Sequence, residues 1–588
     1  MKELMSGNEA IARGLYEAGV RFAAAYPGTP STEIIEEFSK YEGVYAEWSP
    51  NEKVAVEVAI GAALAGEKAL AIMKHVGVNV AADPIFTVSY TGIEGALVIV
   101  TADDPSLHSS QNEQDNRNYA KFAKIPMLEP ADAEEAKRFV KLAFEISEKF
   151  DTPVFLRTTT RVSHSKSVVP LEDPVPYEDK TKISFNAEKY VMVPAEARKR
   201  RIEVEKRMQK LKVFAETFSE NKIEINDPEN GIITAGMPYN YAKDVFPEFS
   251  YLKLGMVNPL PEKLIRDFAA RVKNIYVLEE LDPYLEEQIK AMGIKVTGKE
   301  IFPYTNEFDP GIVEDAIKGK EKTAIAPAPE ITVPSRPPNL CPGCPHRGLF
   351  YTLNKLKVFV TGDIGCYTLA YMKPLSGVHS TICMGASIGM AHGMSKALKE
   401  KGKGKIVGVI GDSTFIHSGI TPLLDMAYNK SNAVIIICDN STTAMTGMQE
   451  HPGTGYTIHG EGTTQLDLEA LVSALGIKNI RVVDPYDLKN TKAVIKEELA
   501  KEGTSVVISK RPCVLFKRAN LKAQEPVQVD PDKCTGCKAC LALGCPPISW
   551  KKVEKKEGSK REGVAVIDKY LCNGCGLCLQ VCKFNAIK

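Results

Sequence analysis

The stretch GDSTFIHSGITPLLDMAYNKSNAVIIICDNSTTAMTG, residues 411–447, decides the fold of the second half of the chain. The apolar run KIVGVI leads directly into it, and a second apolar run, AVIIIC, follows an amphipathic segment. This order predicts a strand, a loop, a helix and a parallel strand, with Asp412 and Asn440 at the carboxyl ends of the strands, where α/β sheets bind ligands. A carboxylate and an amide oxygen suit Mg²⁺, and Gly411 and Gly447 would let the backbone approach a phosphate. A plain βαβ unit with a polar loop is the alternative.

This pattern resembles the thiamine diphosphate (ThDP) motif, which is normally GDG followed by NN. Ser413 stands in place of the second glycine, and Asp439 in place of the first asparagine. Neither change touches the Mg²⁺ ligands that the resemblance implies, which are Asp412, Asn440 and the main-chain carbonyl of Thr442. The following TAMTGMQ is similar to the 2-oxoacid:ferredoxin oxidoreductase family.

Length and composition limit the remaining classes. A chain of 588 residues predicts several domains, and 74 basic against 74 acidic residues indicate neither a nucleic-acid nor a membrane-surface partner. No apolar run approaches the roughly 20 residues of a membrane span, and the amphipathic N-terminus lacks the apolar core of a signal peptide. We therefore expect a cytoplasmic protein. Eight of its 14 cysteines crowd into the last 55 residues, which favours metal or cluster ligation over disulfides.

Residues 1–185 alternate helical segments with apolar strands and predict an α/β domain. The first buried strand ends in YPGTPST, residues 26–32, where Ser31 or Thr32 is expected to cap the next helix. The stretch resembles the YPxTPS segment of the same oxidoreductase family. That resemblance places Thr29 beside the cofactor ring and the substrate.

Glu52 opens the Ala- and Gly-rich segment EKVAVEVAIGAALAG. Taken alone, a glutamate in a first helical turn is a dipole or capping residue. With Gly61 nine residues later, the segment resembles the ThDP glutamate helix. Glu52 would then hydrogen-bond the aminopyrimidine N1′ and promote formation of the ylid nucleophile.

Two polar loops follow apolar strands of this domain and are expected near the same sheet edge. The first, MKHVGVNVAADP, carries His75 and Asn79, and the second, DDPSLHSSQNEQDNR, carries His108, Ser109, Gln111 and Arg117. We expect Arg117 to pair with a 2-oxoacid carboxylate. Solvated surface loops are the alternative.

The middle of the chain contains no catalytic pattern. Residues 186–225 are charged and predict a solvated linker helix, because glutamates interrupt the basic run. Residues 226–325 predict a smaller α/β unit that resembles the transketolase C-terminal-like domain of the family. The Pro-rich AIAPAPEITVPSRPP predicts an extended linker.

Residues 335–525 predict the ThDP diphosphate-type domain, and it contains further cysteines. CxxC indicates a redox dithiol or half of a metal site. Related oxidoreductases hold a cluster near ThDP with CxGC, a GC after a strand and a distant PC. The resemblance implies a third [4Fe–4S] cluster on Cys341, Cys344, Cys366 and Cys513. Buried, inert thiols are the alternative, and they are what we expect of Cys383 and Cys438.

Residues 526–588 resemble the bacterial two-cluster ferredoxin, in which the fourth cysteine of each run crosses to the other cluster. The resemblance implies one [4Fe–4S] cluster on Cys534, Cys537, Cys540 and Cys582. It implies a second cluster on Cys572, Cys575, Cys578 and Cys545. Zinc is the structural alternative, since paired thiolates also bind Zn²⁺.

A ThDP site and a series of clusters on one chain indicate oxidative decarboxylation of a 2-oxoacid. The domain order resembles the large subunit of family members that convert arylpyruvates such as indolepyruvate, with CoA, to aryl-acetyl-CoA and CO₂ while reducing ferredoxin. The resemblance implies a separate small β subunit with the family's γ-type domain, in an α₂β₂ assembly or similar. A non-oxidative ThDP lyase or decarboxylase with a vestigial tail, and an electron carrier without its own chemistry, are the alternatives.

Overall fold

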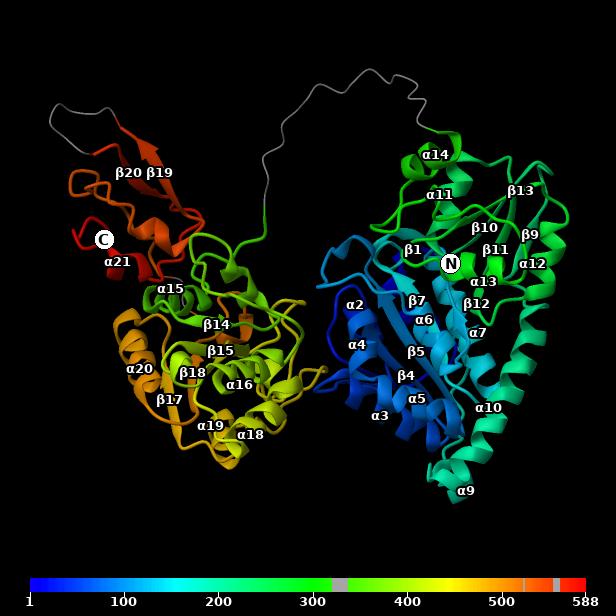
Figure 1. Ribbon diagram of the computed structural model, residues 1–588, viewed down its shortest axis with the longest axis horizontal. Helices are drawn as coiled ribbons and strands as arrows, with labels where there is room; N and C mark the ends of the chain where they lie inside the picture. The colour runs from blue at the N-terminus through cyan, green and yellow to red at the C-terminus, as the bar shows by residue number, and fades with distance from the viewer. Residues whose placement is uncertain (184, 320–336, 522–523, 554–560) are drawn as a thin grey trace. The chain divides into compact units, whose positions relative to one another are not determined.

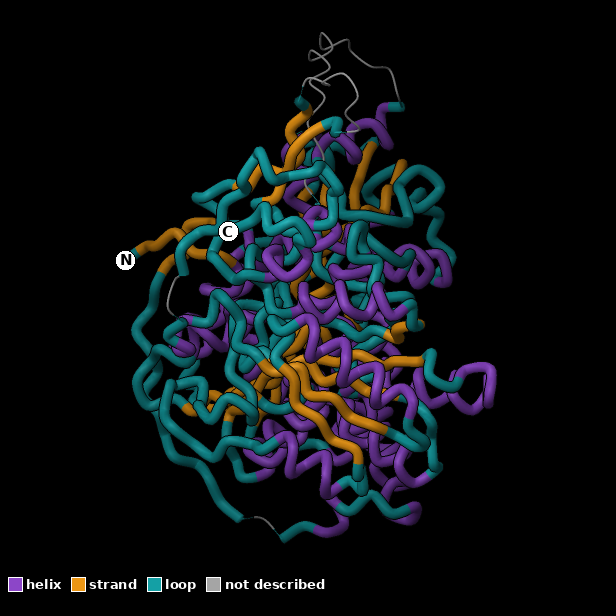
Figure 2. The backbone as a smooth tube through the Cα atoms, turned by 90° about the vertical axis from the view of Figure 1, so that its left-hand side faces the viewer, coloured by secondary structure: helices purple, strands orange, loops and turns teal. Residues whose placement is uncertain are grey.

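The computed structural model of the chain describes residues 1–183, 185–319, 337–521, 524–553 and 561–588. They belong to two compact units, Met1–Ile331 and Thr332–Lys588, each built from layers of helices and sheets (Figures 1 and 2). Within these ranges no helix combines the length and the apolar character needed to cross a bilayer. The expected Pro-rich linker lies almost entirely outside the described residues.

A seven-stranded sheet organises the first unit, in the order β12–β6–β7–β5–β4–β2–β3. Its strands are parallel except for the edge strand β12, which runs antiparallel beside β6. All eight residues of β5 are buried, as its continuous apolar sequence requires in a sheet covered on both faces. The strand bounds are β2 Phe22–Ala25, β3 Tyr45–Trp48, β4 Lys68–Lys74, β5 Ala96–Asp103, β6 Met127–Leu128, β7 Val154–Thr159 and β12 Met256–Asn258.

Helices cover this sheet, with α3 packed on β4 and α7 on β5 and β7. A short antiparallel pair, β1 and β8, lies beside them. The bounds are β1 Lys2–Ser6, α1 Gly7–Glu17, α2 Thr32–Phe38, α3 Glu52–Leu64, α4 His75–Val80, α5 Ala82–Thr91, α6 Arg117–Ala123, α7 Ala133–Phe150, α8 Thr160–His164 and β8 Lys166–Pro170.

The expected domain at 226–325 has its own four-stranded sheet, β13–β10–β11–β9. It nevertheless supplies β12 to the larger sheet, and one hydrophobic core runs through both parts of the unit. The expected boundary is therefore not a packing boundary. The bounds are β9 Lys222–Glu224, β10 Asn230–Ala235, α11 Met237–Val245, β11 Ser250–Leu254, α12 Glu262–Ala269, β13 Asn274–Leu278, α13 Tyr284–Ala291 and α14 Pro310–Lys318.

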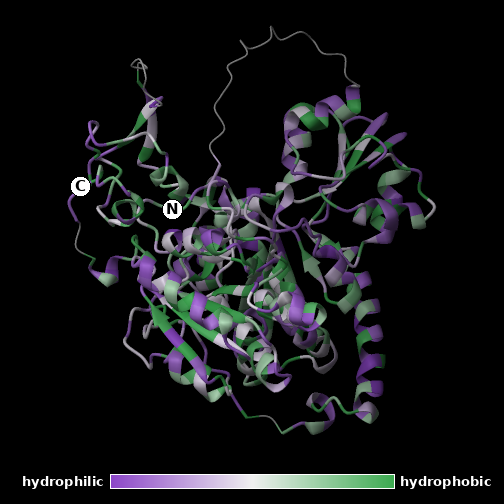
Figure 3. Cartoon of the chain, turned by 60° about the vertical axis from the view of Figure 1, so that its left-hand side comes forward, coloured by the Kyte–Doolittle hydropathy of each residue, from purple (hydrophilic) through white to green (hydrophobic). Residues whose placement is uncertain are grey.

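The predicted solvated linker consists of α9 (Ala187–Tyr190), α10 (Pro194–Ala215) and strand β9. Figure 3 shows α10 as largely hydrophilic, while hydrophobic residues concentrate on the strands. The prediction of a solvated linker is wrong for the second half of α10, which packs against α5. Arg207 is buried there and donates a hydrogen bond to the Ser89 carbonyl at 2.6 Å, which attaches α10 to α5.

A five-stranded parallel sheet, β14–β15–β16–β18–β17, organises the second unit. β15 and β16 are hydrogen-bonded neighbours, so the prediction from residues 411–447 is confirmed. The bounds are α15 His346–Leu356, β14 Phe359–Thr361, α16 Ala386–Leu398, β15 Ile406–Gly411, α17 Asp412–Thr414, α18 Ile420–Tyr428, β16 Val434–Asp439, α19 Leu468–Ala474, β17 Asn479–Val483, α20 Leu488–Ala500 and β18 Ser505–Lys510.

The C-terminal part of this unit is small and contains a hairpin, β19 (Ile548–Lys552) and β20 (Gly563–Ile567), and the short helix α21 (Leu577–Val581). Cysteines contribute to its small core, which Leu488 of α20 also joins. Gln580 accepts a hydrogen bond from the Leu488 N–H at 3.0 Å and donates one to the Tyr486 carbonyl at 2.6 Å. The small domain is therefore attached to the five-stranded domain by direct contacts. The α/β fold class with these domains is as predicted.

Candidate functional site

Glu52 begins α3 just after β3, and its side chain is only 4% exposed. Asn51 caps the helix by accepting a hydrogen bond from the Val54 N–H at 2.9 Å. Gly77 on α4 faces the carboxyl group: a Cβ atom at this position would lie 2.7 Å from Glu52 Cγ and 2.8 Å from Oε1. The missing side chain at 77 therefore makes the space that Glu52 fills.

The turn that carries Thr29 connects β2 to α2 and is closed by its own hydroxyls. The Gly28 N–H donates to Thr32 Oγ1 at 3.0 Å, and the Ser31 hydroxyl donates to the Gly28 carbonyl at 2.9 Å. Ser31 occupies the N-cap position of α2 but makes no side-chain cap bond. The predicted cap is wrong because both hydroxyls are used to hold the turn.

Lys74, a residue that no motif singles out, connects this turn with Glu52. It is the last residue of β4, and its Cγ and Cδ lie 3.0 and 3.1 Å from where a Cβ on Gly28 would be. Its Nζ donates to the Ser109 carbonyl at 2.7 Å. Burial lowers the pKa of Lys74 to about 8, although the carboxylates of Asp104 and Glu52 act in the opposite direction. A lysine at the carboxyl end of a strand was the signal that could have identified it.

The two polar loops of this unit contact each other. His75 Nε2 lies 3.1 Å from the Asn112 carbonyl oxygen, and the Asn79 amide donates to Gln114 Oε1 at 2.9 Å. His108 instead pairs with a glutamate of the neighbouring α/β part at 3.1 Å. The structure thus brings the two loops together at one sheet edge. His108 takes no part in the two hydrogen bonds between them named above.

Arg117 does not have the role expected of it. Its guanidinium is 1% exposed and is bound by Asp115 at 2.5 Å and by Glu279 at 2.7 Å, with further bonds to the Glu280 and Asp282 carbonyls. These partners hold its pKa well above the ordinary value despite burial. The expectation that Arg117 binds a substrate carboxylate is corrected: it joins the two α/β parts of the first unit.

Asp412 lies at the carboxyl end of β15, 3% exposed and hydrogen-bonded by backbone donors. Oδ1 accepts from the Ser413 N–H at 2.8 Å, and Oδ2 accepts from the N–H groups of Asn440 and Ser441 at 3.1 and 2.8 Å. Buried His451, which the motif did not indicate, lies 3.6 Å from Oδ2. Burial alone would raise the pKa of Asp412, but His451 and the backbone donors hold it below its usual value.

The donor set around Asp412 fits Mg²⁺. One carboxamide atom of Asn440 lies 3.3 Å from Asp412 Oδ1 and 2.7 Å from the Thr442 carbonyl oxygen. With the amide nitrogen there, both contacts are hydrogen bonds. With the amide oxygen there, three oxygens converge, which is the arrangement that a hard cation requires. A turn of one side chain therefore converts a hydrogen-bonded loop into a set of metal ligands.

Ser413, Gly411 and Gly447 also belong to the motif. Ser413 is buried and accepts a hydrogen bond from the Thr443 hydroxyl at 2.9 Å. A Cβ on Gly411 would lie 2.9 Å from the Tyr367 ring, so this glycine makes room for an aromatic ring, and the approach of a phosphate to it stays a prediction. Gly447 has φ of +127°, a conformation that favours glycine.

The four cysteines of the proposed third cluster lie close together. All four lie at the ends of elements of this domain: Cys341 and Cys344 precede α15, Cys366 follows β14 and Cys513 follows β18. Burial raises the pKa of the Cys344 thiol to about 12, and the Cys366 and Cys341 thiols raise it further. Burial, followed by Cys513 and Cys341, raises the pKa of Cys366 to about 11. Cys438 is buried as expected, but Cys383 is exposed, so the expectation of a buried thiol there is wrong.

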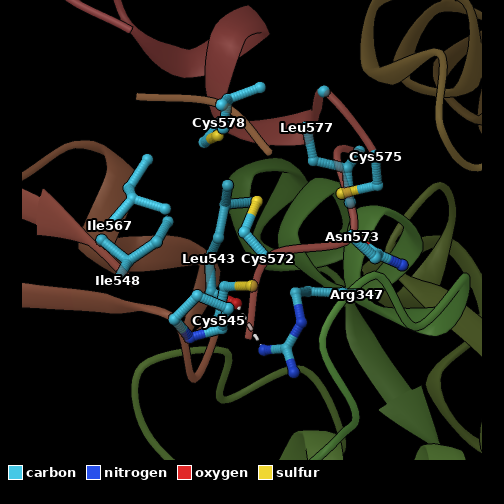
Figure 4. A pocket seen from close by; sticks show the side chains of 13 residues that line it. Arg347, Leu543, Cys545, Ile548, Ile567, Cys572, Asn573, Cys575, Leu577 and Cys578 are labelled. Carbon is cyan, nitrogen blue, oxygen red and sulfur yellow. Dashed lines mark hydrogen bonds between the residues drawn. The ribbon is translucent and has the colours of Figure 1, made fainter. Parts of the chain in front are cut away.

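The eight C-terminal cysteines line two cavities. One is lined by Cys545, Cys572, Cys575 and Cys578, whose sulfur atoms surround the same space (Figure 4). The other is lined by Cys534, Cys537, Cys540 and Cys582. Across the described residues, no three His, Cys, Asp or Glu side chains approach closely enough to hold a single metal ion. Sets of four thiols around a larger space fit a cluster better than one zinc ion.

Arg347, which Figure 4 shows beside Cys545, connects the two groups of cysteine loops. It is fully buried and donates to the Leu543 and Gly544 carbonyls at 2.8 and 2.6 Å, beside Cys545. On the other side it donates to the carbonyls of Leu340 and Cys341 at 2.5 and 3.2 Å. One cation therefore holds the Cys341 loop against the Cys545 loop.

Comparisons with known families agree with this geometry. Residues 13–227 match the family "Pyruvate flavodoxin/ferredoxin oxidoreductase, thiamine diP-bdg", residues 363–509 match "Thiamine pyrophosphate enzyme, C-terminal TPP binding domain", and residues 533–586 match "4Fe-4S dicluster domain". The chain therefore has ThDP-binding domains and a dicluster domain.

Full-length relatives are also known. The chain is 41% identical to indolepyruvate oxidoreductase subunit IorA of Archaeoglobus fulgidus and 44% identical to that of Pyrococcus horikoshii, over all of this chain and 97% of each relative. It is 31% identical to 2-oxoglutarate synthase subunit KorA of Methanocaldococcus jannaschii over 29% of this chain and 49% of that one.

Among solved structures, 2-oxoglutarate:ferredoxin oxidoreductase from Magnetococcus marinus covers 54% of this chain and 65% of its own, with 16% identity and a TM-score of 0.45. The identity and coverage of the IorA subunits decide the family. This chain belongs to the IorA family of indolepyruvate oxidoreductase subunits, within the ThDP-dependent 2-oxoacid:ferredoxin oxidoreductases.

Proposed function

We propose that this chain is the catalytic α subunit that oxidatively decarboxylates arylpyruvates, with indolepyruvate as the preferred substrate. One 2-oxoacid and one CoA would give aryl-acetyl-CoA, CO₂ and a proton, and two ferredoxins would each take one electron. The observation that carries this proposal is the convergence of the Asp412, Asn440 and Thr442 oxygens in the same compact unit as two four-cysteine sets.

The residues divide the chemistry between them. ThDP supplies a carbanion-stabilising thiazolium when it is bound. Glu52 would hydrogen-bond the aminopyrimidine and hold its proton, while Gly77 keeps the carboxyl group in a fixed, buried position. Asp412, Asn440 and the Thr442 carbonyl would hold Mg²⁺.

The cysteine sets would supply one-electron acceptors, which a decarboxylation without oxidation does not need. We propose two [4Fe–4S] clusters in the dicluster domain and a third on Cys341, Cys344, Cys366 and Cys513. The contact of the Cys341 loop with the Cys545 loop through Arg347 supports a continuous path between the sets.

Partners and location follow from the same chemistry. A small β subunit carrying the family's γ-type domain would complete the enzyme as an α₂β₂ assembly, with ferredoxin as electron acceptor. Cysteines that must remain thiolates for cluster ligation require a reducing compartment, and we place the protein in the cytoplasm.

The proposal is tested by anaerobic viologen reduction with the natively purified complex. Indolepyruvate, phenylpyruvate, pyruvate and 2-oxoglutarate are each supplied with and without CoA. We expect a CoA-dependent rate confined to the aryl acids. A rate with pyruvate or 2-oxoglutarate would keep the chemistry and change the substrate. Release of CO₂ without viologen reduction would identify a non-oxidative lyase.

A further inference from the structure

The exposed end of the dicluster domain has a rim of lysines. Lys533 precedes Cys534, Lys538 follows Cys537 and Lys583 follows Cys582. All three lysines are exposed, as are Cys537 and Phe584. We propose that this lysine rim (Lys533, Lys538 and Lys583) is the docking surface for a small acidic iron–sulfur protein that takes electrons from the adjacent cluster. This inference rests on the proposed function.

The other cysteine set has the opposite character. No residue adjacent in sequence to Cys545, Cys572, Cys575 or Cys578 carries a charge. That set faces the five-stranded domain, since Arg347 lines its cavity and the Asn573 amide donates to the Pro342 carbonyl at 3.3 Å. The asymmetry indicates that electrons enter the small domain at the uncharged set and leave at the lysine rim.

Charge indicates the kind of partner. The whole chain is neutral, but residues 526–588 contain eleven Lys and Arg against six Asp and Glu. Asp532, beside Lys533, offsets one of the three rim charges, and Asp530 lies 3.9 Å from Lys588, so the rim keeps a positive excess. A positive surface around an exposed donor accelerates the approach of a negative partner. The step itself is balanced, because the cluster loses one electron and the partner's oxidised cluster gains it.

The experiment uses the purified complex with an acidic two-cluster ferredoxin, and separately with methyl viologen. Lys533→Gln, Lys538→Gln and Lys583→Gln are combined in one variant. The control replaces three exposed lysines of α20 in the same unit, Lys489→Gln, Lys492→Gln and Lys496→Gln. We expect the KM for ferredoxin to rise about tenfold in the rim variant only, with the viologen rate unchanged.

The KM for ferredoxin and the viologen rate together distinguish a failed docking surface from a failed proposed function. Equal KM values for ferredoxin in the rim and control variants would overturn the docking surface. If the rim variant loses iron, two further measurements test the docking surface. Replacing the same lysines by arginine keeps the charge and should keep the KM for ferredoxin. In the wild type this KM should rise with ionic strength, because salt screens docking through charge. A wild-type enzyme that reduces neither acceptor would contradict the proposed function instead.

A second, independent observation concerns Lys74. Because Arg117 is fully bound by Asp115 and Glu279, it is not available to a substrate. Lys74 touches the turn that carries Thr29, and its ammonium has three donors while one is bonded to the Ser109 carbonyl. We infer that Lys74 binds the carboxylate of the 2-oxoacid substrate. This inference also rests on the proposed function.

The surroundings of Lys74 fit this role. The carboxylates of Glu52 and Asp104 raise the pKa of Lys74 and so favour its charged form, and the charge of Asp104 is partly satisfied by bonds from the Ser109 N–H and the Ser110 and Thr160 hydroxyls. Buried His75, the next residue in the chain, is bonded to a backbone carbonyl. Lys74 is the charged group beside Thr29 that keeps open donors.

The test compares Lys74→Met with Lys68→Met, a lysine at the opposite end of the same strand. We expect Lys74→Met to raise the KM for indolepyruvate about 10- to 100-fold with the KM for CoA unchanged, and Lys74→Arg to restore most of it. Indole-3-acetate should inhibit the wild type better than indole-3-acetamide does, and Lys74→Met should lose that preference. The wild-type KM should rise above about pH 8 as Lys74 loses its proton.

If Lys74→Met leaves the KM for indolepyruvate unchanged and still binds indole-3-acetate better than indole-3-acetamide, this inference is overturned. Turnover by the wild type would still support the proposed function. Absence of turnover with every 2-oxoacid would contradict the proposed function itself.

Discussion

At the scale of single residues, the position of the Glu52 carboxyl group depends on a neighbouring glycine. Gly77 gives its carboxyl group room, and substitution by glutamine keeps the size while removing the proton-holding carboxyl. We expect Glu52→Gln to lower turnover by about 10²- to 10⁴-fold, the usual contribution of acid–base groups, with iron content unchanged. Glu57→Gln, on the exposed face of the same helix, should be neutral. Normal activity of Glu52→Gln in anaerobic assays would remove this residue from the mechanism.

A second residue-scale prediction concerns Glu280, buried near Arg157, Glu129 and Glu307. Burial raises its pKa to about 7 from an ordinary value of 4.5, although the Phe308 N–H and Arg157 lower it. The folded protein therefore binds more protons than the unfolded chain between these values, and its stability falls as pH rises through this window. Glu280→Gln keeps the acceptor for Phe308 and should stabilise the first unit by about 2 kcal/mol at pH 8.

The measurement uses the two tryptophans of the chain. In a Trp550→Phe background, Trp48 reports unfolding of the first unit in urea. Glu280→Gln and its parent should unfold alike at pH 5, where Glu280 is protonated. Identical unfolding at pH 8 as well would show that Glu280 does not carry the pH dependence.

At the scale of elements, Arg347 at the start of α15 joins loops from two domains. Its substitution by methionine removes donors from four carbonyls, two of them buried and two partly buried. We expect Arg347→Met to destabilise the second unit by at least about 3 kcal/mol and to lower iron content, because hydrogen bonds to charged groups each contribute about 1.5–3 kcal/mol. Iron analysis and thermal unfolding check this. Arg481→Met, which replaces a half-buried arginine paired with Glu497, is the control, and equal losses in both variants would contradict a specific link.

The elements of the fold differ in how well the sequence alone predicts them. The strands around 411–447 and the short Cys spacing follow local patterns, because both are determined by neighbours in the chain. The crossing of the fourth cysteine of each run came from the resemblance to two-cluster ferredoxins. Three contacts join segments far apart in the chain: the pairing of β12 with β6 spans about 130 residues, the bond from Arg117 to Glu279 spans 162, and the bond from Arg347 to Gly544 spans 197. Such contacts leave no periodic signal. Lys74 was missed for a related reason, because only folding places it beside Gly28 and Glu52.

At the scale of the whole molecule, Glu52 and Asp412 lie in different compact units, so the ThDP-binding groups that we propose are divided between the two units. Mixing two inactive chains tests how the set is completed. In a 1:1 mixture of Glu52→Gln and Asp412→Asn chains, refolded or co-expressed with the second subunit, about a quarter of all sites would be intact if each site combines units of two different chains. That fraction follows because half of the dimers are mixed and one of their two sites has both native residues. We expect this partial activity, since ThDP enzymes commonly assemble their sites from two protomers. Activity that stays absent in mixed dimers isolated by two affinity tags would instead show that each chain completes its own site.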